Sequence, residues 1–274
     1  MSVSALLSFT SFVPVFVLVL FRVAGLMLYA PLLGSARIPK RVKALLAIVL
    51  ALGLAPTITV PPVLPATAWG TALAIGGEMA FGLAMGIILS FVFIAAQWAG
   101  QMVGQEMGLN LSEVFDPQFG GASSVVGDFY YFLTLVIFLG VGGEMQMIRG
   151  IRASFDALPL LSVGINHSVF DLLVRMLTSA TTLAVRLAAP LMVTMLIVDL
   201  TMGFLAKTMP QLNIMTTGMS LKSMIGVFVL FIAISLNGTS SVLVQGINDF
   251  LGGVQSAWHG MTVAPVSAAV HRAG

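Results

Sequence analysis

An apolar stretch without a proline runs from Thr71 to Asn110. An α-helix rises about 1.5 Å per residue, so roughly 20 residues cross the hydrocarbon core of a bilayer, which is about 30 Å thick. A helix over this longer stretch must therefore tilt or extend beyond the hydrocarbon. The segment that follows, Glu113 to Gly121, is polar and rich in turn-forming residues. Irregular backbone of this kind cannot face lipid and survives at membrane depth only when it is buried in protein or lines a watery cavity.

The composition indicates an all-α integral membrane protein. Hydrophobic residues make up 58% of the 274 residues and charged residues only 8%, which is more apolar surface than a soluble domain of this length could cover. The chain has no cysteine, which excludes disulfides and thiolate metal sites. Its few basic residues form no stripe interleaved with aromatic residues, so nucleic acid is not an expected partner.

The apolar runs predict a series of long, partly kinked helices. We expect Pro190 to kink the helix predicted at Asp171–Met209. The residues from 256 onward are expected to form a disordered tail. The first ten residues carry no Lys or Arg, so we expect the first helix to be retained and not cleaved as a signal peptide. The expected helices are Phe12–Leu33, Val42–Pro56, a long helix from near Trp69 to Asn110, Ser124–Phe155, Asp171–Met209, and a last helix from Ile214 to Leu251.

The dense basic cluster of the chain lies after the first helix, at Arg37, Lys40, Arg41 and Lys43. Lys and Arg in short loops favour the cytoplasmic side, so the cluster places this turn inside and the N-terminus outside. The cluster could serve insertion alone, or it could also bind anionic lipid or an acidic partner.

Small residues recur at four-residue spacing in the long helix. Such repeats let helix backbones approach closely in a membrane. Packing within the chain is the simpler explanation, whereas the number of such sites on one helix favours a contact between subunits. The helix-packing candidates are Gly82, Gly86, Gly100, Gly104 and Gly108.

Several charged residues interrupt apolar runs, where an unpaired charge costs about 2.5 kcal/mol or more. We therefore expect them to be buried and paired. Arg175 and Arg186 share one helix face by spacing, and the candidate partners in this chain are Asp171, Glu78 and Asp199. The carboxylates are scattered over different helices, so we expect structural ion pairs and no proton relay. The candidate buried charges are Arg22, Glu78, Arg175, Arg186 and Asp199.

Motifs for catalysis, phosphate binding or metal binding are absent from the sequence, and we expect no enzyme activity and no cofactor. A secondary transporter of small solutes is the alternative that buried charges and broken helices leave open. It would require a substrate cavity and inverted repeats.

Three motifs, in their order and spacing, carry a resemblance to a known family. They are the segment Arg37 to Lys43 after a helix that contains Arg22, the segment Gly104 to Gly108 that leads to Asp116 and Pro117, and the segment Met209 to Ile214. Together they resemble the FliR flagellar export-gate family, with the SctT family of injectisomes close to it. The resemblance covers about residues 10 to 255.

The resemblance implies a non-enzymatic part of the type III protein export gate, placed in the bacterial inner membrane within the flagellar basal body. In that family the chain assembles with FliP and FliQ subunits into a channel for unfolded flagellar proteins. FlhB and FlhA are further expected partners, beside the lipid membrane itself.

The resemblance also divides the chain into a FliP-like part at residues 1–165, a FliQ-like helical hairpin at 166–255 and a tail at 256–274. A plug that helps to close the channel maps onto residues 108–124, the irregular segment noted above. Its candidate gate residues are Leu109, Asn110, Phe115, Asp116, Pro117, Phe119, Gly120 and Gly121. The hairpin break is expected at Pro210, Gln211 and Asn213.

Overall fold

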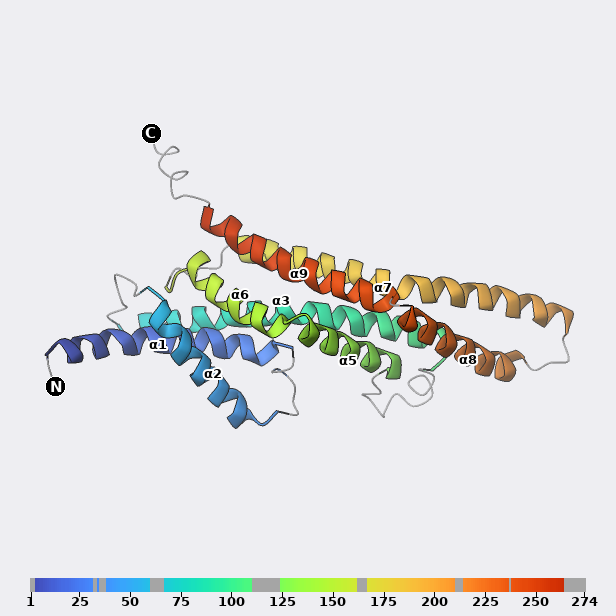
Figure 1. Ribbon diagram of the computed structural model, residues 1–274, viewed down its shortest axis with the longest axis horizontal. Helices are drawn as coiled ribbons and strands as arrows, with labels where there is room; N and C mark the ends of the chain where they lie inside the picture. The colour runs from blue at the N-terminus through green and yellow to red at the C-terminus, as the bar shows by residue number, and fades with distance from the viewer. Residues whose placement is uncertain are drawn as a thin grey trace, which may run out of the picture. The chain divides into compact units, whose positions relative to one another are not determined.

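The described part of the chain consists of α-helices, a short 3₁₀ helix (Ala55–Thr57) and turns, and it contains no β-strand, as the sequence predicted. The computed structural model describes residues 3–31, 34, 38–59, 67–109, 124–161, 167–209, 214–236 and 238–263. The helices, shown in Figure 1, are α1 (Val3–Tyr29), α2 (Lys40–Leu54), α3 (Ala68–Glu106), α5 (Val125–Gly140), α6 (Gly143–Ala157), α7 (His167–Thr208), α8 (Ile214–Ser235) and α9 (Gly238–Val263).

Four helices among the described residues are long and apolar enough to cross a membrane: Phe12–Tyr29 within α1, Ala68–Glu106, Val169–Thr208 within α7, and Gly218–Ser235 within α8. Helices α5 and α6 could add a fifth crossing as one broken span. The chain is therefore a multi-pass membrane protein.

The helices form two compact units. Unit 1 comprises Met1–Phe91, Gly143–Leu177 and Phe250–Gly274, and unit 2 comprises Val92–Gly142 and Thr178–Asp249. Helices α3, α7 and α9 each contribute residues to both. Both units combine segments from the two sides of residue 165. The division at residue 165 that the resemblance implies stays a prediction.

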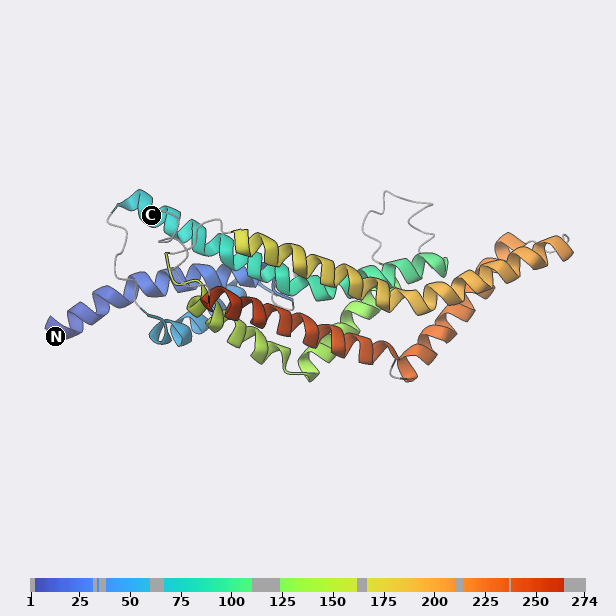
Figure 2. The same ribbon diagram turned by 90° about the horizontal axis from the view of Figure 1, so that it is seen from above.

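In unit 1 the backbones of α1 and α3 touch, and the two helices run side by side in both views (Figures 1 and 2). A Cβ added at Gly82 would collide with the carbonyl oxygen of Arg22, and one at Gly86 would lie 2.5 Å from the carbonyl oxygen of Leu26. A Cβ added at Gly25 of α1 would likewise collide with the carbonyl oxygen of Met79. The repeat at Gly82 and Gly86 thus packs helices of this chain against each other.

The C-terminal helix extends further than the sequence predicted. Helix α9 continues through residues 256–263, where we expected the tail to begin, and Trp258 is only 1% exposed. Its ring packs edge-on against Phe81 of α3, with ring centroids 5.8 Å apart. Burial of this large apolar ring stabilises the additional helical turns.

In unit 2 the C-terminal part of α3 packs against the start of α5. A Cβ added at Gly100 would lie 2.6 Å from the carbonyl oxygen of Val126 and 2.6 Å from the Cα of Gly127. Elsewhere in this unit, Gly246 of α9 receives the side chain of Leu183 of α7. Gly100 therefore also serves a contact within the chain.

Two predicted helices are each divided into two. The prediction of one continuous helix over Ser124–Phe155 is wrong. Helices α5 and α6 are bent by 73° at a break that contains Gly142, whose φ is +69°. A left-handed residue ends a helix, and glycine adopts this conformation without steric cost. The expected helix from Ile214 to Leu251 is likewise separate helices, α8 and α9, and the sequence at the break reads Leu-Asn-Gly, which favours a turn.

Candidate functional site

Arg22 and Glu78 form an ion pair inside unit 1, where both side chains are 1% exposed. Arg22 Nε, from α1, donates to Glu78 Oε2, from α3, at 2.6 Å. The close backbone approach at Gly82 brings the two helices near enough for this contact. The pair is among the charges that the sequence predicted to be buried and paired, and each residue supplies the compensating charge that the other needs in apolar surroundings.

The guanidinium of Arg22 also closes the end of α6. Nη1 donates to the carbonyl oxygens of Leu158 at 3.0 Å and Ser154 at 3.3 Å, and Nη2 donates to Leu158 at 3.1 Å. The last carbonyls of a helix lack partners within the helix, and this end of its dipole is negative. Arg22 therefore supplies two donors to the carbonyl oxygen of Leu158 and a second donor to that of Ser154, which also accepts from the N–H of Leu158 at 2.9 Å.

Glu78 in turn holds the turn after α6. Its Oε1 accepts a hydrogen bond from the backbone N–H of Leu161 at 3.1 Å. Leu161 has a φ of +70°, in the left-handed region that bulky residues rarely adopt, at a cost of about 1–3 kcal/mol. The carboxylate of Glu78 thus stabilises a strained turn that leads toward α7.

Two aromatic rings lie against the Arg22 guanidinium. Its Cζ lies 4.8 Å from the ring centroid of Phe81 and 4.2 Å from that of Phe155, distances at which a cation is attracted to the ring. We call Arg22, Glu78, Phe81, Phe155 and the carbonyl of Leu158 the Arg22 cluster. It joins α1, α3 and α6, and its balanced charges suit it to positioning helices.

The predicted gate segment is bounded on one side by a well-formed helix end. Gly108 has a φ of +73°, its N–H donates to the carbonyl of Gln105, and the N–H of Leu109 donates to the carbonyl of Gly104, both at 3.0 Å. These bonds make a Schellman motif, which stops α3. Gly104 and Gly108 therefore take part in ending the helix. Leu109 is 39% exposed, and the other candidate gate residues, Asn110, Phe115, Asp116, Pro117, Phe119, Gly120 and Gly121, lie outside the described residues.

The other side of the gate segment is a capped helix start. Ser124 Oγ accepts a hydrogen bond from the N–H of Gly127 at 3.3 Å, which satisfies one of the free donors at the start of α5. The contact between Gly100 and Gly127 fixes this start against α3. Residues 110–123 therefore connect two helix ends that are held against each other.

Helix α8 contacts the C-terminal end of α3 through residues that the sequence analysis did not identify. Ser223 Oγ donates to the carbonyl oxygen of Met107 at 2.7 Å, and Gly226 receives the Met107 side chain. Lys222 Nζ lies 2.8 Å from Asp199 Oδ2 and 3.6 Å from Glu106 Oε2. More than 100 residues separate α8 from α3, so no local spacing could have revealed these contacts. We call Glu106, Met107, Lys222 and Ser223 the α3 anchor.

The remaining charges differ from the prediction. Arg175 and Arg186 are exposed on α7, and neither forms a salt bridge within the described ranges. Asp199 is also exposed and pairs with Lys222, whereas Glu78 is bound to Arg22. In the described part of the single chain, Arg175, Arg186 and Asp199 are thus exposed and not buried as predicted. Their burial against a neighbouring subunit stays a prediction.

The remaining predictions concern the hairpin break and metal binding. The predicted hairpin break at Pro210, Gln211 and Asn213 lies outside the described residues, between the end of α7 and the start of α8. Within the described ranges, no group of three or more His, Asp or Glu residues is placed to hold a metal ion.

Comparisons with known proteins agree with one another. The family described as "Bacterial export proteins, family 1" matches residues 13–244. The chain is 29% identical to the flagellar biosynthetic protein FliR of Bacillus subtilis (strain 168), over 81% of this chain and 87% of the relative. It is 30% identical to the protein of the same name from Aquifex aeolicus (strain VF5), over 79% and 83%. The surface presentation of antigens protein SpaR of Shigella sonnei is 29% identical, over 64% and 66%.

Proposed function

Because this chain belongs to family 1 of the bacterial export proteins, we propose that it is a non-enzymatic core component of the type III protein export gate of the flagellum. The length of the match supports this proposal, since the relatives named FliR align over most of both chains. The proposal places the chain in the bacterial inner membrane, within the flagellar basal body. The family assignment favours export of proteins over transport of small solutes.

In this proposal the chain works as one subunit of a hetero-oligomer with FliP and FliQ, with FlhB and FlhA as further partners. The support is the apolar surface of the hairpin formed by α7 and α8, which lie side by side in Figures 1 and 2. Leu200, Phe204, Phe228 and Phe231 are each between 63% and 70% exposed. An apolar surface of this kind fits either lipid or neighbouring helices. The exposed arginines of α7 favour neighbouring subunits that carry carboxylates.

The gate is the second part of the proposal: residues 108–124 form the plug that helps to close the channel. The single observation that carries it is the geometry at the two flanks, where a Schellman motif ends α3 and a serine cap begins α5. These ends fix where the segment leaves and re-enters the helices. Phe115 and Phe119 supply apolar bulk against water and ions.

Assembly is tested by purifying the full-length chain from its own membranes in mild detergent. We expect FliP and FliQ subunits to copurify and to be identified by mass spectrometry. Recovery of a monomer that takes up solute would contradict the proposal and favour the transporter.

The plug is tested by deleting residues 116–121 and measuring the conductance of the membrane to small ions. We expect a leak, because the deletion removes Phe119 and the two glycines that follow it. Deletion of six residues from the C-terminal segment, 266–271, is the control and should leave conductance low. An assembled complex with unchanged conductance would show that the plug lies elsewhere.

A further inference from the structure

Helix α2 of unit 1 carries an exposed apolar face. The helix contacts α1, and its buried residues are Ala47, Ala51 and Leu54. Five large aliphatic side chains of α2 are each between 40% and 63% exposed. Their spacings of three and four residues place them together on the side of the helix opposite the buried residues. We call them the α2 face: Val42, Leu45, Ile48, Val49 and Leu52.

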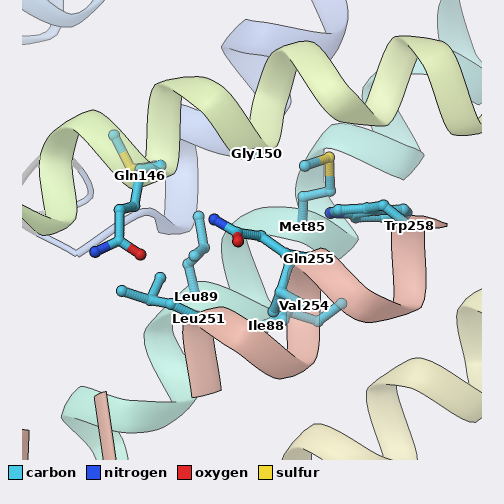
Figure 3. Close-up of a pocket in the computed structure, with 10 residues that line it drawn as sticks. Met85, Ile88, Leu89, Gln146, Gly150, Leu251, Val254, Gln255 and Trp258 are labelled. Carbon is cyan, nitrogen blue, oxygen red and sulfur yellow. The ribbon is translucent and has the colours of Figure 1, made fainter. Parts of the chain in front are cut away.

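Large apolar side chains between α3, α6 and α9 are enclosed, in contrast to the α2 face. Met85, Ile88, Val254 and Trp258 line a common space there and are each between 1% and 6% exposed (Figure 3). Neighbouring helices keep those side chains from water. The α2 face has no such cover in the described part of the chain, and a contiguous exposed apolar surface marks a site of contact with a membrane or another molecule.

The N-terminal end of α2 is basic and lacks counter-charges. Lys40 and Arg41 are exposed, Lys43 is half-buried, and none of the three forms a salt bridge within the described ranges. The sequence contains no Asp or Glu before Glu78, and that carboxylate is bound to Arg22. The basic end of α2 is therefore open to an external anion.

The length of α2 suits a helix that enters one leaflet of the membrane. Its 15 residues span about 22 Å, which is less than the hydrocarbon core of about 30 Å. Basic residues at the end of an apolar helix lie at the level of the headgroups. Lys and Arg in this turn favour the cytoplasmic side, where the leaflet carries anionic lipids. The basic end then meets phosphate while the α2 face meets acyl chains.

We propose that α2 docks an anionic phospholipid, whose phosphate contacts Lys40, Arg41 and Lys43 and whose acyl chains lie along the α2 face. Charge complementarity selects this occupant, because a zwitterionic lipid fits the apolar face but brings no net charge to the basic end. The fork of donors on Arg matches phosphate, and each Lys adds a point charge. Each basic residue near an anionic membrane surface strengthens binding about fivefold. The site goes beyond the proposed gate function and does not depend on it.

The test uses the full-length chain, with any subunits that copurify, in vesicles of phosphatidylcholine. One set of vesicles also contains a trace of phosphatidylglycerol whose acyl chain bears a photoreactive diazirine, and a second contains phosphatidylcholine with the same photoreactive chain. After illumination, digestion and mass spectrometry, we expect at least tenfold more adducts on the α2 face from the phosphatidylglycerol probe. At Val136 of α5, which is 66% exposed and reports ordinary lipid contact, both probes should label equally.

Substitutions at the basic end make the result specific. Lys40→Gln, Arg41→Gln and Lys43→Gln together should lower the phosphatidylglycerol adducts on the α2 face at least tenfold and leave the phosphatidylcholine adducts unchanged. Loss of basic residues can invert a membrane protein, so protease accessibility of the termini verifies the orientation of the variant. The matched control removes the same charge from three other exposed positions and should retain the selectivity: Arg149→Gln, Arg152→Gln and Lys207→Gln.

The unmodified chain supplies a second measurement that is independent of any variant. Raising the ionic strength from about 0.1 M to about 1 M shortens the screening length from about 10 Å to about 3 Å. The excess of phosphatidylglycerol adducts over phosphatidylcholine adducts on the α2 face should therefore fall several-fold.

The outcomes separate the alternatives. Selective labelling by phosphatidylglycerol that falls with the substitutions at the basic end, or with salt if that variant does not insert correctly, supports the proposal. Equal labelling by the two probes overturns it, as does selectivity that falls equally in the matched control. Absence of adducts from both probes on the α2 face means that a protein subunit covers this face, which also overturns lipid docking.

Discussion

At the scale of single residues, Arg22 illustrates why a charge can lie in the interior of a membrane protein. Its guanidinium meets the carboxylate of Glu78, the carbonyls at the end of α6 and two aromatic rings. A buried pair of this kind is costly to break, although it need not be more stabilising than a well-packed apolar pair. The Arg22 cluster therefore specifies one arrangement of α1, α3 and α6.

We predict that Glu78→Leu lowers the free energy of unfolding by about 3–5 kcal/mol, because it leaves Arg22 buried without a counter-charge. The double variant Arg22→Leu with Glu78→Leu should recover much of this loss. Unfolding by SDS titration of the purified chain measures both. Glu144→Gln, at an exposed position of α6, is the control, with an expected change within about 0.5 kcal/mol. Equal effects of Glu78→Leu and Glu144→Gln would contradict the structural role of the pair.

A second prediction concerns the glycines of α3. Gly82→Ala should destabilise the chain by about 1–3 kcal/mol, because the new Cβ meets the backbone of Arg22, which cannot move aside as a side chain could. Gly76→Ala on the same helix has nothing within 4 Å and should stabilise it by up to about 1 kcal/mol through helix propensity. The same SDS titration applies. Similar effects of the two alanines would mean that α1 and α3 do not touch in solution.

At the scale of helices, the end of α3 is where three elements meet. Helix α8 binds it through the α3 anchor, α5 packs on it at Gly100, and the Schellman motif stops it at Gly108. In the proposed function the plug begins immediately beyond. The stability of this helix end therefore sets how firmly that side of the plug is held.

We predict that Ser223→Ala loosens the end of α3. Loss of one hydrogen bond costs about 1 kcal/mol, which corresponds to roughly fivefold more frequent opening. Hydrogen exchange of the amides of residues 103–109, followed by mass spectrometry, measures this change. Ser241→Ala removes a hydroxyl that bonds only within its own helix and should leave this exchange unaltered. Unchanged exchange in Ser223→Ala would remove Ser223 from the anchor.

At the scale of the whole molecule, the described chain leaves much of α7 and α8 uncovered. Both arginines that the sequence placed in an apolar helix, Arg175 and Arg186, are exposed there. The carboxylates that we expected as partners are engaged elsewhere, Glu78 with Arg22 and Asp199 with Lys222. The proposed hetero-oligomer therefore requires that a carboxylate partner for these arginines comes from a neighbouring subunit.

We predict that Arg186→Gln lowers the yield of assembled complex about tenfold while the chain itself still inserts and folds. An interfacial charge whose partner is left unpaired costs about 2–5 kcal/mol, which exceeds a tenfold change in affinity. Native mass spectrometry of the purified complex gives the yield. Arg152→Gln, at an exposed position of α6, is the control. A normal yield with lost export would show that Arg186 acts in transport and not in assembly.

Local patterns predicted the helices well where one long apolar run dominates. Helices α3 and α7 begin and end within a few residues of the positions expected from composition and prolines. The predictions failed at the breaks after Gly140 and Ser235, because glycine in an apolar run is compatible with either a continuous or a broken helix. They also failed at residues 256–263, where helix formation accompanies the packing of Trp258 on Phe81.

The sequence by itself determined that this chain is an all-α, multi-pass membrane protein, and it predicted close helix contacts at glycines and paired charges in apolar runs, Arg22 and Glu78 among them. Those conclusions follow from hydropathy, helix length and the cost of unpaired charge, which act locally. Only the tertiary structure decided that Gly82 and Gly100 pack within the chain, that Glu78 pairs with Arg22, and that Lys222 and Ser223 hold the end of α3. Such partners are tens to more than 100 residues apart, and no period along the chain encodes which helix faces which.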